Sequence, residues 1–162
     1  MPEIASLKRW IPKEVLERID REIEEMNVPE LELDFDADKE KRKINFSDLS
    51  GQTNQQLEQY LTIYGGFKAY LEAQLAYYES KHGVLEATYE EALAKMLFSL
   101  SQKYEKKPTK EVMHGEAIAS SPQLKKLRQD LIEAEALCRR VQGLRDSYKA
   151  AYDTVSRIVA LR

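Results

Sequence analysis

Basic side chains gather between residues 103 and 128, where the sequence has its clearest capacity to bind a ligand. Seven lysines and arginines fall in this interval against three acidic residues, which leaves a local charge of +4. The basic residues are Lys103, Lys106, Lys107, Lys110, Lys125, Lys126 and Arg128. A local positive charge attracts phosphate groups. We therefore expect these seven side chains to be candidate phosphate ligands of a nucleic acid.

Tyr104 lies among the lysines and adds an aromatic ring to this basic connector, by which we mean residues 103–128. An exposed tyrosine can stack on an unpaired base, so Tyr104 joins the candidate nucleic-acid-binding residues. The alternative is that the lysines form a solvated helix end, where they interact favourably with the helix dipole. The sequence leaves both interpretations open.

Motifs that carry catalysis or hold a metal are missing from the sequence. It contains no glycine-rich phosphate loop, no C-x-x-C pair, no H-E-x-x-H and no G-x-S-x-G. His82 falls at an apolar position, which predicts a buried structural histidine, whereas His114 is expected to be exposed. The single Cys138 cannot form an internal disulfide. The sequence thus predicts a protein without catalytic residues, metal or cofactor.

Two long amphipathic segments must position the basic connector. Residues 54–104 contain no proline and carry apolar residues in heptad spacing, and the last helix, from Pro122 to the C-terminus, repeats the pattern. We call these positions the seam, represented by Leu57, Tyr64, Leu71, Tyr78, Leu85, Leu127, Leu131, Val141, Tyr148 and Val155. Helices this long need an equally long partner, so the pattern predicts an all-α, antiparallel, coiled-coil-like helical hairpin.

Individual capping residues and glycines indicate where the predicted helices begin and where another helix could approach them closely. Thr53 or Asn54 is expected to cap the first long helix. Thr109 is expected to cap a short connector helix that runs to Ala119. Gly65, Gly66 and Gly83 fall inside the first long helix, where glycine is less favourable than alanine. Either close helix packing or a kink or subunit contact would explain them.

The first 50 residues form a separate predicted region, and residues 51–162 form the oligomerising hairpin domain. Pro12 opens a helix that ends before Pro29, with Leu16, Ile19, Ile23 and Met26 on its apolar stripe. Residues 30–46 alternate apolar and polar residues, which favours a small β-hairpin or an extended arm. Asp34, Asp36 and Asp38 lack the glycine and glutamate of a calcium loop. Trp10 is expected either to pack at the helix start or to anchor an arm.

Composition and charge bound the class of protein. The 162 residues are 43% hydrophobic and 33% charged, with six glycines and five prolines, a composition typical of long helices. The net charge is −3. No signal peptide or membrane-spanning run is recognisable, so we expect a soluble, cytoplasmic protein. Apolar residues outside the seam predict a homo-oligomer; these are Leu61, Leu75, Leu93, Leu97, Leu137 and Ile158.

From about residue 57 onward the order of segments resembles the UvsY-like recombination mediators of T-even and related phages. The resemblance is carried by LEAQLAYYESKHG, the basic and polar break, EVMHGEAIASSPQL and the closing VQGLRDSYKAAYDTVSRIVAL. It implies a ring-forming homo-oligomer in phage-infected bacteria. Such a protein binds single-stranded DNA and helps a RecA-like recombinase displace single-strand-binding protein. The first 50 residues do not match the family.

The competing interpretation is a phage structural, assembly or adaptor coiled coil that binds only other proteins. Both interpretations use the same helices and differ in what the basic connector does. A mediator should bind single-stranded DNA with an affinity that falls as the salt concentration rises, whereas an adaptor should not bind it.

Overall fold

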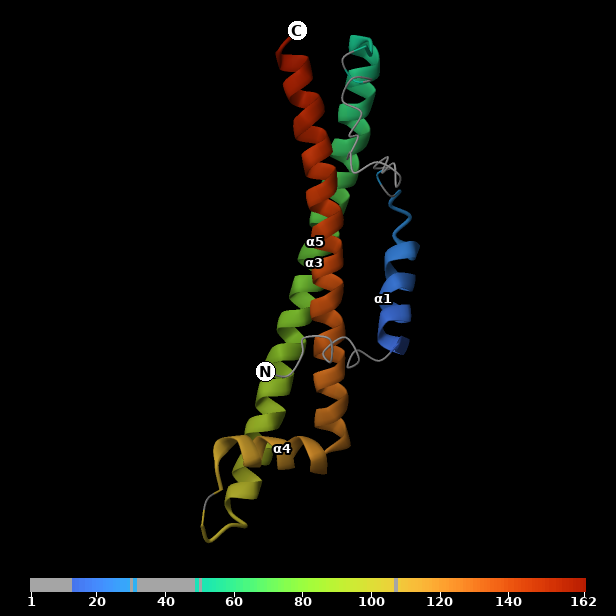
Figure 1. Ribbon diagram of the computed structural model, residues 1–162. Coiled ribbons are helices and arrows are strands. Elements are labelled where there is room, and N and C mark those ends of the chain that lie inside the picture. The colour runs from blue at the N-terminus through green and yellow to red at the C-terminus, as the bar shows by residue number, and fades with distance from the viewer. Residues whose placement is uncertain (1–12, 30, 32–48, 50, 107) are drawn as a thin grey trace, which may run out of the picture. The chain divides into compact units, whose positions relative to one another are not determined.

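The computed structural model describes residues 13–29, 31, 49, 51–106 and 108–162. Within them lie four helices, α1 (Lys13–Glu25), α3 (Asn54–Ser101), α4 (Lys110–Ser120) and α5 (Pro122–Ala160), and no strand (Figure 1). The all-α fold predicted from the heptad spacing is confirmed. Trp10, Asp34, Asp36, Asp38 and the expected hairpin at 30–46 lie outside the described residues.

The helices are divided between two compact units. The first unit combines α1 up to Ile19 with Ala76–Arg139, and the second combines Asp20–Leu75 with Arg140–Arg162. In each unit a stretch of α3 runs antiparallel to a stretch of α5 and packs against it (Figure 1). The two long helices therefore pair as the seam predicts.

The core of the second unit is made of seam residues from both helices. Leu57, Leu71, Val141, Tyr148 and Val155 are at most 2% exposed. The rings of Tyr64 and Phe67 pack on that of Tyr148 at centroid distances of 6.2 and 5.2 Å. The Tyr148 hydroxyl donates a hydrogen bond to the Pro29 carbonyl at 2.5 Å, which ties the chain after α1 to α5. Burial raises the pKa of the Tyr148 hydroxyl, which therefore stays protonated and able to donate.

The core of the first unit buries fewer seam residues. Tyr78, Leu100, Ala117, Leu124, Ala134 and Leu137 are buried. Leu85, Leu127 and Leu131 are half-buried, as is Tyr64 in the second unit. His82 is also half-buried, so the prediction of a buried histidine at this position was wrong.

The docked stripe of helix α1 overlaps the predicted one, since Ile19 is buried and Ile23 and Met26 are half-buried, but Val15 is buried in place of Leu16. Val15 and Ile19 are 2% and 3% exposed, whereas Leu16 is 45% exposed. Arg18 fixes this orientation, because its guanidinium makes two hydrogen bonds to Glu133 of α5, at 3.0 and 2.5 Å. The helix ends at Glu25, and Asn27 follows with a φ of 50°, a left-handed conformation that asparagine tolerates at helix ends.

The glycines of α3 have different surroundings. A Cβ on Gly65 would lie 3.2 Å from the Tyr152 ring, so close packing explains this glycine. A Cβ on Gly66 or Gly83 would meet nothing within 4 Å. No contact within the described chain therefore requires glycine at these two positions.

A reciprocal capping box starts α3. The Gln56 N–H donates to the Thr53 hydroxyl oxygen at 3.3 Å, and the Thr53 N–H donates to the Gln56 side-chain carbonyl at 2.9 Å. Of the two caps proposed from sequence, Thr53 is the one used. The helix ends at Ser101, three residues before the predicted end at Tyr104.

Replacing Thr53 with alanine should lower the free energy of unfolding by about 1 kcal/mol, because the hydroxyl oxygen that accepts the Gln56 N–H is lost. Thr62→Ala is the matched control, since the Thr62 hydroxyl only donates back to the Glu58 carbonyl of its own helix. Urea denaturation followed by circular dichroism measures both. Equal effects of the two substitutions would contradict the cap.

Candidate nucleic-acid interface

The basic connector is built where α3 ends and α5 begins, within the first unit. After Ser101 the chain forms a loop, returns as α4 and turns directly into α5 (Figure 1). Leu100, Ala117 and Leu124 hold the three segments together in one buried cluster. The loop is therefore attached to a packed core at both of its ends.

The described basic side chains of the connector are exposed and lack acidic partners. Lys103 and Lys106 lie in the loop, Lys110 begins α4, and Lys125, Lys126 and Arg128 lie in the first two turns of α5. None of the six forms an ion pair with another described residue. Lys107 lies outside the described residues.

Basic residues elsewhere are often neutralised by carboxylates. Seven of them form ion pairs with Asp or Glu side chains: Lys13, Arg18, Lys68, Lys95, Arg139, Arg140 and Arg145. In the connector, by contrast, Glu105 and Glu111 are exposed and form no ion pair with another described residue, and Glu116 accepts a hydrogen bond from a tyrosine. The positive field of the connector is thus left available to an external anion.

The start of α5 strengthens this field. The Ser121 hydroxyl oxygen accepts the Leu124 N–H at 3.2 Å and so caps the helix. No acidic residue occurs in the first turn, which leaves the partial positive charge of the helix N-terminus uncompensated. Helix N-termini with free charge of this kind favour phosphate.

The two groups of cations flank α4. Lys103, Lys106 and Lys110 precede it or begin it, whereas Lys125, Lys126 and Arg128 follow it. Eleven helical residues span roughly 16 Å at 1.5 Å per residue. The groups are therefore spaced to contact different phosphates of one strand.

Tyr104 has a structural contact that the sequence did not reveal. Its hydroxyl donates a short hydrogen bond to the Glu116 carboxylate of α4, and its ring is half-buried. This bond raises the pKa of Tyr104, because the neutral phenol is the donor and the ionised form would face a carboxylate. Tyr104 thus connects the loop to α4 through this hydrogen bond. Base stacking by Tyr104 stays a prediction.

The Tyr104 contact gives a pH dependence with a definite sign. Because the pKa is raised on folding, the stabilisation is present at neutral pH and is lost as the pH rises through the raised value. The absorbance of the tyrosines is titrated with pH in the unaltered protein and in Tyr104→Phe, and the two curves are subtracted. The difference should show one tyrosine that ionises with a pKa above the usual 10.0. A difference curve centred at the usual value would contradict the contact.

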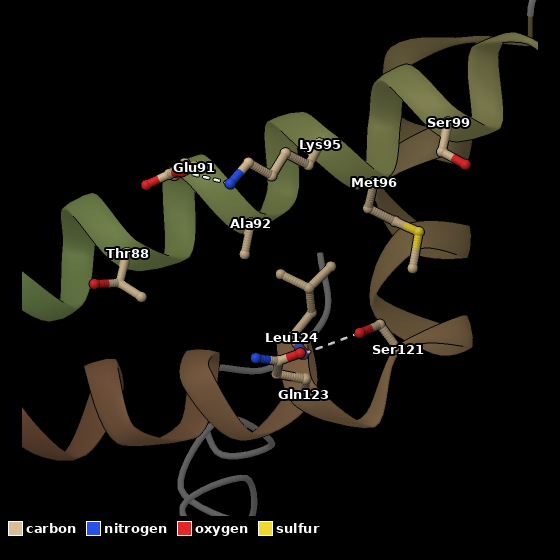
Figure 2. Close-up of a pocket in the computed structure, with 9 residues that line it drawn as sticks. All are labelled: Thr88, Glu91, Ala92, Lys95, Met96, Ser99, Ser121, Gln123 and Leu124. Atoms are coloured by element: carbon tan, nitrogen blue, oxygen red, sulfur yellow. Dashed lines mark hydrogen bonds and ion pairs between the residues drawn. The ribbon is translucent and has the colours of Figure 1, made fainter.

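An open groove of about 470 Å³ lies between α3 and the start of α5. Figure 2 shows Ala92, Met96 and Leu124 directed into it, with polar side chains around its edge. Gln123 lines the groove and lies one helical turn from Lys126, so the two share a side of α5. Sequence reasoning missed this groove, because it depends on how the end of α3 sits over α5.

Other titratable groups offer little chemistry. Cys138 is a free thiol whose pKa is raised by burial and by the nearby Glu79 and Glu135, so it stays protonated near neutral pH. Among the described residues, no three His, Cys, Asp or Glu side chains come together as a metal site.

None of the helices in the described part of the chain has the length and apolarity required to cross a bilayer. In comparisons with known proteins, no family, no curated protein and no solved structure matches the chain.

Proposed function

We propose that the protein is a non-enzymatic accessory factor of recombination that binds single-stranded DNA through the basic connector. The observation that carries the proposal is the set of six exposed cations in the first unit that form no ion pair with any residue that the structure describes. Binding of this kind depends on phosphate contacts and does not read sequence. It needs none of the catalytic or metal-ligating groups that the sequence lacks.

The groove beside α5 gives the proposal a place for a base. Lysines on the first turns of α5 would hold phosphates while an unpaired base enters between Met96 and Leu124. The apolar floor favours the face of a base, and the polar edge can accept or donate hydrogen bonds without selecting one base. This arrangement suits single-stranded DNA better than a duplex, whose bases are stacked and paired.

The mediator role rests on the resemblance to UvsY-like proteins. Under this proposal a homo-oligomer holds several connectors near one strand, and their weak sites add to a high effective concentration. The assembly would then help a RecA-like recombinase to displace single-strand-binding protein. The overall charge of −3 counts against strong binding of a polyanion, so the proposal depends on the local charge of the connector.

A protein-binding adaptor is the second candidate, and the exposed apolar side chains favour it. Phe98 and Val112 are 70% and 56% exposed in the first unit. Exposed apolar residues of this size commonly mark contacts with other proteins. The adaptor alternative predicts no salt-dependent binding of nucleic acid.

The test is a fluorescence-anisotropy titration of labelled oligo-dT with the full chain across a salt series, with light scattering on the same samples. The mediator proposal predicts saturable binding whose log affinity falls linearly with log salt, by a particle larger than one chain. A folded protein that does not bind at low salt would refute the proposal and leave the adaptor alternative.

A further inference from the structure

The loop between α3 and α4 is held by few hydrogen bonds. At its start the Lys103 N–H donates to the Leu100 carbonyl at 2.9 Å, and the next backbone hydrogen bond is the one that Thr109 accepts at the start of α4. Between these two points, the bond from the Tyr104 hydroxyl to the Glu116 carboxylate is the only hydrogen bond that joins residues described by the structure. This part of the loop therefore depends on Tyr104 for its conformation.

Glu116 gives the loop a fixed point of attachment. The next residue, Ala117, is 0% exposed and belongs to the buried cluster with Leu100 and Leu124. The backbone of α4 is thus held in the core of the first unit at the position where Tyr104 binds. A side chain on a packed helix holds its partner more precisely than a side chain on a loop does.

Tyr104 lies between two of the candidate phosphate ligands. Lys103 precedes it directly and Lys106 follows two residues later, and both are exposed and form no ion pair with another described residue. Because consecutive Cα atoms are about 3.8 Å apart, anchoring Tyr104 restricts the backbone of both lysines. A lysine on a free loop would lose more conformational entropy on binding a phosphate than a lysine on an anchored loop.

We propose that Tyr104 is a positioning residue of the nucleic-acid interface, whose hydrogen bond to Glu116 holds Lys103 and Lys106 where they contact phosphates of a single strand. The inference rests on the proposed binding of single-stranded DNA by the basic connector, and it deepens that proposal by naming a residue that acts through two of the cations. Positioning uses the hydroxyl of Tyr104, whereas stacking on a base would use its ring.

Removing the hydroxyl alone tests the positioning role. Tyr104→Phe keeps the ring, and its affinity for oligo-dT at low salt should fall about fivefold, the order of effect of one hydrogen bond. The slope of log affinity against log salt should also decrease, by about 1.4 if both lysine contacts are lost. Tyr148→Phe is the matched control, because it removes a phenol hydrogen bond to the Pro29 carbonyl in the second unit. It should bind oligo-dT as the unaltered chain does.

Two substitutions of Glu116 separate the hydrogen bond from the charge. Glu116→Gln keeps an oxygen that can accept the bond from Tyr104, whereas Glu116→Leu does not, and both remove the same negative charge. The glutamine variant should bind oligo-dT at least as tightly as the unaltered chain. The leucine variant should bind at least about threefold more weakly than the glutamine variant. Equal affinities of the two variants, both shown to be folded by circular dichroism, would overturn the proposal.

A double-mutant cycle tests whether Tyr104 acts through the two lysines. In a background with Lys103→Gln and Lys106→Gln, adding Tyr104→Phe should change the affinity less than about twofold, because the side chains that it positions are already removed. A loss as large as in the unaltered background would show that the hydroxyl supports some other part of the connector, which would contradict the proposal.

The same titrations distinguish failure of this inference from failure of the DNA proposal. An unaltered chain that does not bind oligo-dT at low salt would overturn both. If the unaltered chain binds, and Lys125→Glu with Lys126→Glu weakens the binding, the DNA proposal stands. Unchanged affinity and salt slope for Tyr104→Phe would then refute the positioning role alone.

Discussion

Leu71→Ala should lower the free energy of unfolding by about 2–5 kcal/mol, the range for truncating a fully buried leucine in a packed core. Leu71 is 0% exposed in the second unit, where seam residues of α3 and α5 meet. The loss combines the removed apolar area with the cavity that paired rigid helices cannot close.

Val159→Ala is the control for this prediction. Val159 lies on the α5 side of the same unit but is 39% exposed, so its truncation should cost about 0.5 kcal/mol or less. Urea denaturation at one fixed protein concentration measures both, because association would otherwise shift the apparent stability. Similar losses for the two variants would mean that the seam is not the core of the second unit.

Reversing two charges at the start of α5 should strongly weaken DNA binding. Lys125→Glu with Lys126→Glu removes two candidate phosphate ligands that form no ion pair within the described part of the chain and places acidic groups beside the helix N-terminus. The affinity for oligo-dT should fall on the order of tenfold or more at low salt. The slope of log affinity against log salt should decrease by about 1.4, or about 0.7 per contact.

Lys149→Glu is the control for this experiment, and it is compared with Lys125→Glu alone so that both variants reverse one charge. Lys149 is also exposed on α5 and has no ion pair with a described residue, but it lies in the second unit, outside the connector. It should change the affinity little beyond the effect of net charge. An equal loss for this variant would show that binding follows total charge and not the connector.

The sequence predicts the helical hairpin well because periodicity reports burial directly. A heptad repeat that includes Leu57, Leu71 and Val141 requires a long apolar partner, and the structure buries all three. The docked face of α1 could not be predicted in the same way. Val15 and Leu16 are adjacent, and either could share a stripe with Ile19, so the choice depended on tertiary contacts such as that between Arg18 and Glu133.

Self-association stays a prediction, and the six apolar residues on which it was based are buried or half-buried within the chain. Leu75 and Leu137 are buried within the chain, and Leu61, Leu93, Leu97 and Ile158 are half-buried, so they offer little free surface. The exposed repeat of Tyr77, Val84 and Phe98 has the same heptad spacing as the seam. Spacing alone cannot tell which of two repeats on one helix faces the intrachain partner.

The candidate site was predicted in part. The clustering of lysines can be read from the sequence, but the absence of acidic partners cannot, because ion pairs depend on which helix faces meet. The bond between Tyr104 and Glu116 requires α4 to fold back beside the loop, and the groove at Leu124 requires α3 to lie over α5. These features appear only when the three segments are assembled.

The most direct test of the account maps where DNA touches the chain. Oligo-dT is crosslinked to the 162-residue chain by ultraviolet light, the complex is digested, and the modified peptides are identified by mass spectrometry. We expect adducts on peptides from residues 103–128, and a marked decrease when Lys125 and Lys126 are both replaced by glutamate. Adducts confined to other segments, such as residues 140–162, would contradict the assignment of the connector as the DNA interface.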